Sequence, residues 1–185
     1  MLICSSRLIH GEIPPFFIDF NRLQQTRLTK DLGVLIDNNL DFSAHINDTV
    51  RRASCRANLI LKCFTSNDTK TMMQAFLTYV RPTLEYASPI WSPHTLKDIT
   101  AIESVQRRFT KRLTGLFDLN YHDRLSNLGL ETLELRRIKN DLILAYKIIF
   151  GLVLTSIKLK INPYNSTRGH QYKLTTPTAT CDTTK

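Results

Sequence analysis

Ten Lys and Arg residues occur in short clusters along the middle of this chain. Their spacing would place the members of a cluster on one face of a helix or at its end. They are Arg51, Arg52, Arg56, Lys62, Arg107, Arg108, Lys111, Arg112, Arg136 and Arg137. An exposed positive charge on a rigid element is all that a phosphate contact requires. Aromatic residues do not alternate with these cations as a base-stacking surface would need. The pattern therefore predicts contact with phosphates and no reading of bases.

Each cluster also has a structural explanation, which the sequence leaves open. Asp48 lies four residues before Arg52, the favourable order for an ion pair along a helix. Glu131 and Glu134 could neutralise the pair of arginines that follows them. Cations in the last turns of a helix also suit its dipole, which explains one or two of those between 107 and 112.

Residues arranged for catalysis or metal binding do not occur in the sequence. The 11 Asp are dispersed without any Asp-Asp pair, and there is no glycine-rich phosphate loop and no recognisable Ser, His and Asp grouping. The four Cys form no CxxC pair, and the five His are scattered. We expect no catalytic residue, no metal site, no cofactor and no small-molecule substrate in this chain.

The net charge of +9 is unevenly placed along the 185 residues. Residues 1–50 hold 4 Lys and Arg against 6 Asp and Glu (−2), residues 51–147 hold 16 against 9 (+7), and residues 148–185 hold 5 against 1 (+4). The positive excess therefore lies on the middle and the end of the chain, which favours a phosphate-bearing partner. A hydrophobic content of 42% suits one globular domain with a core.

Apolar residues recur at every third or fourth position over five stretches, which predicts a mostly α-helical fold. The expected helices cover residues 44–64, 69–87, 96–113, 121–128 and 133–150, and the four long ones form a bundle-like domain. Candidate capping residues are Ser43, Asn67, Asp68 and Thr132 at the starts, and Gly115, Gly129 and Gly151 at the ends.

A proline-rich stretch between residues 81 and 93 holds the only Trp. Pro82 lacks an amide hydrogen and clashes with the carbonyl four residues back, so we expect it to kink the helix over 69–87. Pro89 and Pro93 predict a non-helical turn around Trp91. A large aromatic side chain after a helix end typically fills the gap between packed helices. The expected buried group is Trp91, Leu84, Tyr86, Phe109 and Leu135.

Short strands are expected before the first helix, at residues 2–4, 15–20 and 32–36. A tail without apolar periodicity follows the last helix, and the Thr-rich run 175–180 is typical of disorder. We therefore divide the chain into a strand-containing piece at 1–41, a helical domain at 42–152 and a largely disordered tail at 153–185.

Several ordered blocks resemble the C-terminal part of reverse transcriptases from non-long-terminal-repeat (LINE-type, jockey-like) retrotransposons. The blocks are Lys30-Asp31-Leu32-Gly33-Val34; Arg81-Pro82 with Leu84-Glu85-Tyr86-Ala87 and Trp91-Ser92-Pro93; Ile102-Glu103-x-Val105-Gln106-Arg107-Arg108-Phe109-Thr110; Asp123-Arg124-Leu125-x-x-Leu128-Gly129-Leu130 with Leu133-Glu134-x-Arg136-Arg137; and, more weakly, Arg168-Gly169-His170. Together they cover about residues 28–173.

The resemblance implies a fragment of an RNA-directed DNA polymerase: the last palm strands at 1–41, then the helical thumb and the region beyond it. It implies RNA or an RNA–DNA duplex as the partner, together with the palm and fingers that would lie upstream. Magnesium is expected only in the intact polymerase, because the family's catalytic Asp pair is absent here. Two alternatives stay open: a remnant without function, or a helical protein-interaction module that does not bind nucleic acid.

The setting expected from the sequence is intracellular, in the nucleus or the cytoplasm. The first 20 residues lack the continuous apolar run of a signal peptide. The most apolar stretch, 142–154, is interrupted by Lys147 and Gly151 and is too short to span a bilayer. We therefore expect no membrane association.

Overall fold

The computed structural model describes residues 16–64, 68–157, 159, 161–162 and 172–175. Its internal contacts divide the chain into two compact units, residues 1–137 and residues 138–185. The predicted strand at 2–4 and the Thr-rich run, apart from residue 175, lie outside the described residues. The division into domains at residues 41 and 152 stays a prediction.

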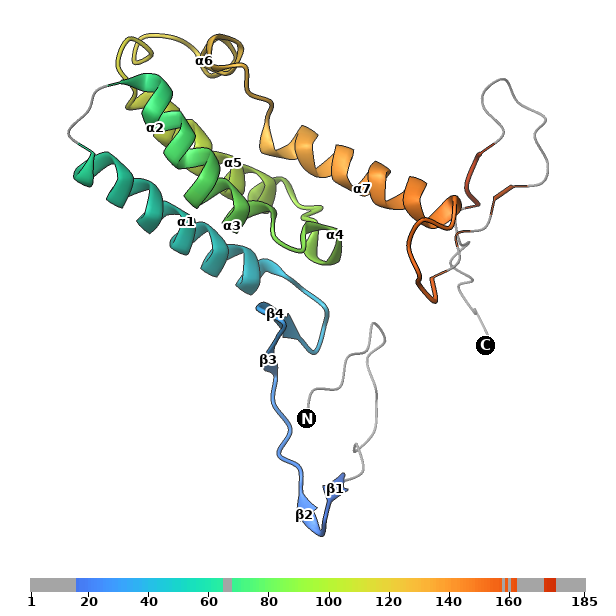
Figure 1. The fold of residues 1–185 in the computed structure, drawn as a ribbon. Helices are drawn as coiled ribbons and strands as arrows, with labels where there is room; N and C mark the ends of the chain where they lie inside the picture. Colours follow the sequence, from blue (N-terminus) through green and yellow to red (C-terminus); the bar gives the residue numbers. More distant parts are fainter. Residues whose placement is uncertain (1–15, 65–67, 158, 160, 163–171, 176–185) are drawn as a thin grey trace, which may run out of the picture. The chain divides into compact units, whose positions relative to one another are not determined.

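The predicted mostly α-helical fold is confirmed. The elements are α1 (Ser43–Cys63), α2 (Thr69–Ala75), the π-helix η1 (Phe76–Val80), α3 (Arg81–Glu85), α4 (Ser88–Trp91), α5 (Leu96–Lys111), α6 (Tyr121–Leu128) and α7 (Leu133–Ile149). α1, α5 and the continuous segment from α2 to α3 lie side by side, and α6 follows beyond the end of α5 (Figure 1).

Two small antiparallel strand pairs precede the helices: β1 (Phe17–Ile18) with β2 (Asn21–Arg22), and β3 (Leu28–Asp31) with β4 (Val34–Asp37). The predicted strand at 32–36 is wrong at its start, because Leu32 and Gly33 form the turn between β3 and β4. Their φ angles are +45° and +89°. Positive φ at both central residues is the requirement of a type I′ hairpin turn, and glycine meets it without strain.

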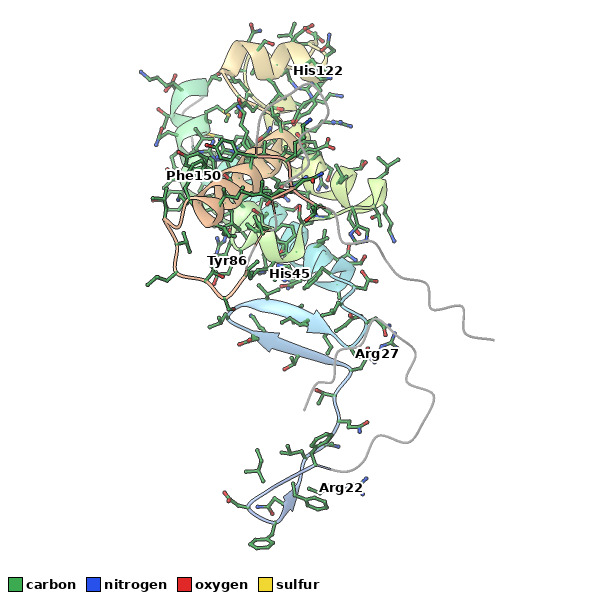
Figure 2. The ribbon with its side chains drawn as sticks, turned by 90° about the vertical axis from the view of Figure 1, so that its right-hand side faces the viewer. Arg22, Arg27, His45, Tyr86, His122 and Phe150 are labelled. Carbon is green, nitrogen blue, oxygen red and sulfur yellow. The ribbon has the colours of Figure 1, made fainter. Side chains whose placement is uncertain are left out.

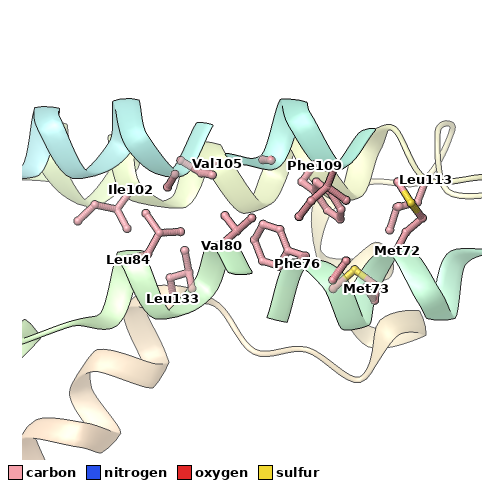
Figure 3. Packing of buried hydrophobic residues seen from close by; sticks show 14 of the residues in the cluster. Met72, Met73, Phe76, Val80, Leu84, Ile102, Val105, Phe109, Leu113 and Leu133 are labelled. Atoms are coloured by element: carbon pink, nitrogen blue, oxygen red, sulfur yellow. The ribbon is translucent and has the colours of Figure 1, made fainter. Parts of the chain in front are cut away.

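The core of residues 16–137 is a layer of side chains from α5 packed between α1 and the α2–α3 segment (Figure 3). Ile102, Val105 and Phe109 follow the helical spacing and are at most 2% exposed. Phe109 meets Phe76 with ring centroids 4.6 Å apart. Large side chains at such sites carry much of the stability of a domain, since emptying one costs about 3–5 kcal/mol.

The helix predicted over 69–87 is not α-helical throughout, and the exception lies next to Pro82, the residue predicted to kink it. The turn before it is the π-helix η1, in which the Arg81 amide donates to the carbonyl of Phe76, five residues back. Pro82 has no amide hydrogen to donate and its ring would crowd the carbonyl of Thr78 in a regular helix. A wider turn at this point accommodates the ring.

Trp91 is 1% exposed, and its indole N–H donates to the carbonyl of Tyr86 at 2.8 Å. The predicted non-helical turn around it is wrong, because Ser88–Trp91 forms the short helix α4 with Pro89 in its first turn. Proline is tolerated there, since the first amides of a helix have no intrahelical partner. Leu84 and Phe109 are buried with Trp91 as predicted.

Two members of the predicted buried group are exposed. Tyr86 is 57% exposed because it lies after the end of α3, where its hydroxyl donates to the Leu32 carbonyl at 2.9 Å. Leu135 is 42% exposed, whereas Leu133, two positions earlier, is fully buried. In a helix these positions point to different faces. The apolar spacing of α7 therefore indicated a helix correctly and its buried face wrongly.

Side-chain caps explain several of the helix boundaries. Asp68 accepts the amides of Lys70 and Thr71, and Thr132 Oγ1 accepts the Leu135 amide at 3.1 Å, as predicted. Ser43 is not a cap: it is the first residue of α1, and its hydroxyl donates to Asp98 Oδ2 at 3.0 Å.

Glycines with positive φ lie near three helix ends. Gly129 caps α6 with a φ of +62°, as predicted. Gly115 has a φ of +77° but lies beyond the end of α5, whose C-cap is Arg112, so the predicted glycine cap there is wrong. Gly151, with a φ of +67°, follows the end of α7.

The β3–β4 hairpin is held against the helices by His45 and Tyr86, which meet it from α1 and from the end of α3 (Figure 2). His45 is 2% exposed, and its Nδ1 accepts the Leu35 amide at 3.2 Å. An accepting Nδ1 places the proton of the neutral ring on Nε2, which lies 3.5 Å from Thr49 Oγ1. Burial, and next the charge of Arg52, lower the pKa of His45 below the ordinary histidine value of 6.5.

In the unit beginning at Ile138, the rest of α7 leads into an aromatic group. The ring of Phe150 lies 4.4 Å from that of Tyr146 and 5.3 Å from that of Tyr172, measured between centroids. An antiparallel bridge joins Ile161 to Leu174.

Candidate nucleic-acid interface

Arg108 and Arg112 of α5 reach across to α1 and form the centre of the candidate interface. Arg108 Nη2 donates to Ser54 Oγ at 3.2 Å, and Arg112 Nη1 donates to Asn58 Oδ1 at 3.1 Å. The two arginines are four residues apart, and so are Ser54 and Asn58. Each pair of neighbours therefore lies along one face of its own helix. A small pocket between the two helices is lined by all four side chains. We call this row the α1–α5 cleft.

The two arginines of the cleft are exposed and bonded to neutral oxygens. Within the described ranges, the ion pairs of the chain engage Asp48 and Glu85 and none involves Arg108 or Arg112. A guanidinium carries more N–H donors than these bonds use. Both side chains therefore keep donors and their full charge for an anion.

Lys111 and Arg107 flank the cleft and are each placed over an aromatic ring. Lys111 Nζ lies 5.4 Å from the centre of the Phe117 ring, and the guanidinium carbon of Arg107 lies 4.8 Å from that of Tyr121. Such cation–π contacts hold the charge in place without neutralising it. All four predicted cations of this helix are exposed and gather at its C-terminal end.

On α1 two of the predicted cations form ion pairs within the described part of the chain and two do not. Arg51 and Arg52 both pair with Asp48, at 2.7 and 2.9 Å. The hydrogen bond from Arg51 is the main cause that lowers the pKa of Asp48. Asp48 thus balances one of the two positive charges and occupies both guanidinium groups, which was the structural explanation considered for Arg52.

The other two cations of α1 occupy different faces. Arg56 donates to Thr83 Oγ1 at 2.5 Å and to the Tyr79 carbonyl, so it links α1 to the segment around α3. Lys62 is exposed and lies four residues after Asn58, which continues the row of Ser54 and Asn58 towards the end of α1. Lys62 therefore extends the α1–α5 cleft, and Arg56 does not.

The two arginines of α7 are engaged within the protein. Arg136 forms a two-point ion pair with Glu85, through Nε and through Nη2, the latter at 3.1 Å from Oε2. Arg137 is only 3% exposed. The buried guanidinium of Arg137 has no access to a nucleic-acid backbone. Arg136 would have to break its ion pair with Glu85 before it could bind a phosphate. We therefore leave both out of the interface.

A buried polar network behind α5 escaped the sequence analysis. Glu103 accepts the hydroxyl of Tyr121 and the amide of Leu133, the latter at 3.0 Å. Gln106 donates to the Tyr121 hydroxyl at 3.1 Å and to the Glu131 carbonyl at 3.0 Å. Burial, and then the bond to Glu103, raise the pKa of Tyr121 well above its ordinary value. The network fixes the ring over which Arg107 lies.

A second buried contact completes this side of α5. Arg124 is 4% exposed and donates to Thr110 Oγ1 at 3.3 Å and to the Leu119 carbonyl at 2.7 Å. Glu103, Gln106, Thr110 and Arg124 all belong to the sequence blocks that carry the family resemblance. Their polar side chains on an otherwise apolar helix face were the signal that could have revealed them.

Other kinds of site can be considered only for the residues that the structure describes. Within that part of the chain, no group of three or more His, Cys, Asp and Glu side chains is placed to hold a metal ion. None of the helices traced there is both long enough and apolar enough to cross a membrane.

Comparison with known proteins gives two partial likenesses. An uncharacterized protein of Caenorhabditis elegans is 23% identical over 124 residues, which are 65% of this chain and 63% of that protein. A probable RNA-directed DNA polymerase from transposon X-element of Drosophila melanogaster is 26% identical over 105 residues, 55% of this chain. The likeness supports a retrotransposon-related origin. No protein-family model and no solved structure matches the chain.

The matched part is a minor share of the fly protein. The aligned residues span 12% of its length, so most of that polymerase has no counterpart in this chain. The residues aligned with the worm protein span 63% of its length, less than two thirds.

Proposed function

We propose that this chain is a non-catalytic helical part of a retrotransposon RNA-directed DNA polymerase, the thumb, and that it grips RNA or an RNA–DNA duplex by its phosphates. The observation that carries the proposal is the α1–α5 cleft, where two exposed arginines without carboxylate partners lie in register with Ser54 and Asn58. The likeness to the transposon polymerase supports the choice of partner.

The proposed contact set is smaller than the sequence predicted. It consists of Lys62, Arg107, Arg108, Lys111 and Arg112, with Ser54 and Asn58 as neutral hydrogen-bonding partners. Arginine suits this role because its planar group binds a phosphate through two N–H donors at once. The contacts are to the backbone, so affinity should depend on charge and salt and little on base sequence.

The chain is expected to bind without polymerising. Nucleotide transfer needs carboxylates that fix two magnesium ions, and this sequence has no Asp-Asp pair. In the proposed whole enzyme, magnesium and the reaction would belong to the palm, and this part would hold the duplex in place.

Asn58→Asp tests the cleft without removing a cation. The new carboxylate would form an ion pair with Arg112, which the structure places 3.1 Å from Asn58 Oδ1. That bond would compete with phosphate, so we expect duplex affinity to fall roughly ten- to a hundredfold, the range for one hydrogen bond to a charged group. Fluorescence anisotropy with several duplexes of different sequence measures the effect, which should be alike for all of them.

Asn127→Asp is the matched control, because it adds the same charge to an exposed position on α6. It should weaken binding by much less than Asn58→Asp. Equal losses for the two variants would show that only net charge matters. Unchanged affinity in Asn58→Asp would show that the cleft does not bind the duplex, and would leave the chain as a remnant or a protein-interaction module.

A further inference from the structure

The segment that follows α5 presents an aromatic ring beside the cations of the α1–α5 cleft. Phe117 is 66% exposed, whereas Leu113 and Leu116 on the same segment are 3% and 8% exposed. Lys111 Nζ lies 5.4 Å from the centre of the Phe117 ring. A single exposed ring is ordinary on a protein surface, so its surroundings decide what it can bind.

An open hollow of about 520 Å³ is lined both by this ring and by the C-terminal end of α5. Its volume is within the range of roughly 300–1,000 Å³ that is typical of small-ligand pockets. Arg108, Lys111 and Arg112 supply its charge, and Leu113 and Phe117 supply apolar surface. Among the described residues that line the hollow, none is acidic. The hollow therefore combines a flat apolar surface with positive charge.

The backbone around the hollow is held in place within the protein. The Leu116 amide donates to the Leu113 carbonyl at 3.2 Å, and the Leu119 amide donates to the Leu116 carbonyl at 3.3 Å. Thr69 Oγ1, at the start of α2, donates to the Thr114 carbonyl at 3.3 Å. Because these bonds already order the segment, binding a ligand against Phe117 costs little further ordering of the backbone.

We propose that Phe117 stacks an unpaired base of the bound nucleic acid, next to a duplex whose phosphates contact Arg108 and Arg112. The inference rests on the proposed function, because it uses the same cations. A positively charged groove combined with an aromatic ring is how proteins hold single-stranded nucleic acid. A base inside a duplex is covered on both faces by its neighbours, so the ligand of this ring is an unpaired nucleotide.

The spacing of the sequence did not reveal this ring. Phe117 follows Lys111 by six residues, and only the turns after α5 bring the two side chains together. Lys111 covers at most one face of the ring, which leaves the other face for a base. Stacking accepts every base, so the inference agrees with the prediction that this chain does not read bases.

Two RNA–DNA duplexes with the same short single-stranded extension test the proposal on the full chain. In one duplex the extension is abasic, so the phosphates are equal and only the bases differ. The parent should bind the extension with bases about tenfold more tightly, within the range for one stacked base. Fluorescence anisotropy measures both dissociation constants, with the extension placed on each strand in turn. An affinity ratio near one for both strands overturns the proposal.

Phe117→Leu and Phe20→Leu are the matched pair of variants. Phe20 lies in the strand region and is fully exposed, so both changes remove an exposed ring and keep an apolar side chain. Phe117→Leu should reduce the affinity ratio to less than about twofold, whereas Phe20→Leu should keep it at about tenfold. If the ring only held Lys111 in place, both ligands would weaken alike and the ratio would stay. A folded Phe117→Leu variant with the parent's ratio, or equal loss in both variants, overturns the proposal.

Phe117→Trp should keep the affinity ratio at or above that of the parent, because the indole is a larger aromatic surface. Loss of the ratio in this variant would contradict stacking. If the duplex without an extension binds and Asn58→Asp weakens it, while the parent's ratio is near one, the stacking inference alone is wrong. If Asn58→Asp has no effect on the duplex, the inference fails together with the proposed function.

Discussion

The cations considered for the candidate interface differ in whether a carboxylate or a neutral oxygen binds them, and this difference decides which of them can bind a phosphate. Arg51 and Arg112 are both exposed arginines on helices, yet Arg51 is paired with Asp48 and Arg112 with a neutral amide oxygen. An arginine that is already paired must give up a carboxylate before it contacts another anion, so its net gain is small. The cations of α5 have no such cost.

A residue-scale prediction concerns His45, which is buried and neutral. Because the folded pKa lies below the unfolded value of 6.5, the folded state binds fewer protons than the unfolded state as pH falls. The neutral His45 ring contributes its full share of the unfolding free energy above pH 6.5. That share is lost as the pH falls from 6.5 through the folded pKa. Urea unfolding at pH 7.5, 6.5, 5.5 and 5.0 should show a falling midpoint.

His45→Phe is the control for that prediction. The variant lacks both the proton and the acceptor for the Leu35 amide, so it should be less stable at pH 7.5 and lose part of the pH dependence. The exposed His94 and His122 are common to both proteins. If the midpoints of parent and variant fall in parallel, His45 does not cause the effect.

A second residue-scale prediction compares two neighbours in α4. Trp91 is 1% exposed and Ile90 is 61% exposed. Trp91→Ala should lower the free energy of unfolding by about 3–5 kcal/mol, because it empties a large core site. Ile90→Ala should change it by less than about 0.5 kcal/mol, as exposed sites usually do. Similar losses in chemical denaturation would mean that Trp91 does not fill the core.

At the scale of elements, the β3–β4 hairpin has a turn residue that fits its conformation poorly. Leu32 has a φ of +45° and is 84% exposed, and the left-handed region costs an ordinary residue roughly 1–2 kcal/mol. Asn tolerates it and is preferred at this position of a type I′ turn. Leu32→Asn should therefore raise the unfolding free energy by about 0.5–1 kcal/mol.

Leu96→Asn is the comparison for the turn variant. Leu96 is similarly exposed, at 82%, but is the first residue of α5 with an ordinary φ. Thermal unfolding should show a gain for Leu32→Asn only. A gain in both variants would mean that removing an exposed apolar side chain, and not the turn conformation, is responsible.

Apart from α4, the helices could be predicted closely from the sequence, because each depends on signals within one stretch. Apolar spacing and Gly129 indicated the bounds of α6, and Pro82 indicated an irregularity in the helix over 69–87, found as η1. The face of α7 could not be found this way. Leu133 and Leu135 are the same residue type, and only their tertiary neighbours decide which of them is buried.

The cation cluster of the candidate site could be predicted from the sequence, but the residues that its members contact could not. The cluster on α5 follows from charge alone, whereas its bonds to Ser54 and Asn58 depend on which face of α1 lies opposite. Nothing in the local sequence of Arg136 indicates that Glu85, 51 residues earlier, will bind it. Tertiary contacts and burial therefore removed Arg56, Arg136 and Arg137 from the predicted set and added Ser54 and Asn58. The local pairing with Asp48 removed Arg51 and Arg52.

At the scale of the whole molecule, the proposed role of this chain is to hold nucleic acid as one part of a polymerase. Helices pack around α5, and its C-terminal end presents cations whose positions are fixed by contacts to α1, Phe117 and Tyr121. A rigid basic end needs no catalytic group to hold a duplex by its phosphates. The central claim is therefore that this end of the bundle supplies the binding energy.

The salt dependence of duplex binding tests that claim most directly, with Arg108→Glu plus Arg112→Glu compared with Arg22→Glu plus Arg27→Glu. Both double variants change the net charge equally, and the second alters exposed residues of the strand region (Figure 2). With about four or five phosphates bound, log affinity of the parent should fall with log salt at a slope of roughly −3 to −5. The cleft variant should lose about two from that slope and bind all sequences more weakly, while the strand variant keeps the slope of the parent. A folded cleft variant with the parent's affinity and slope would contradict the account.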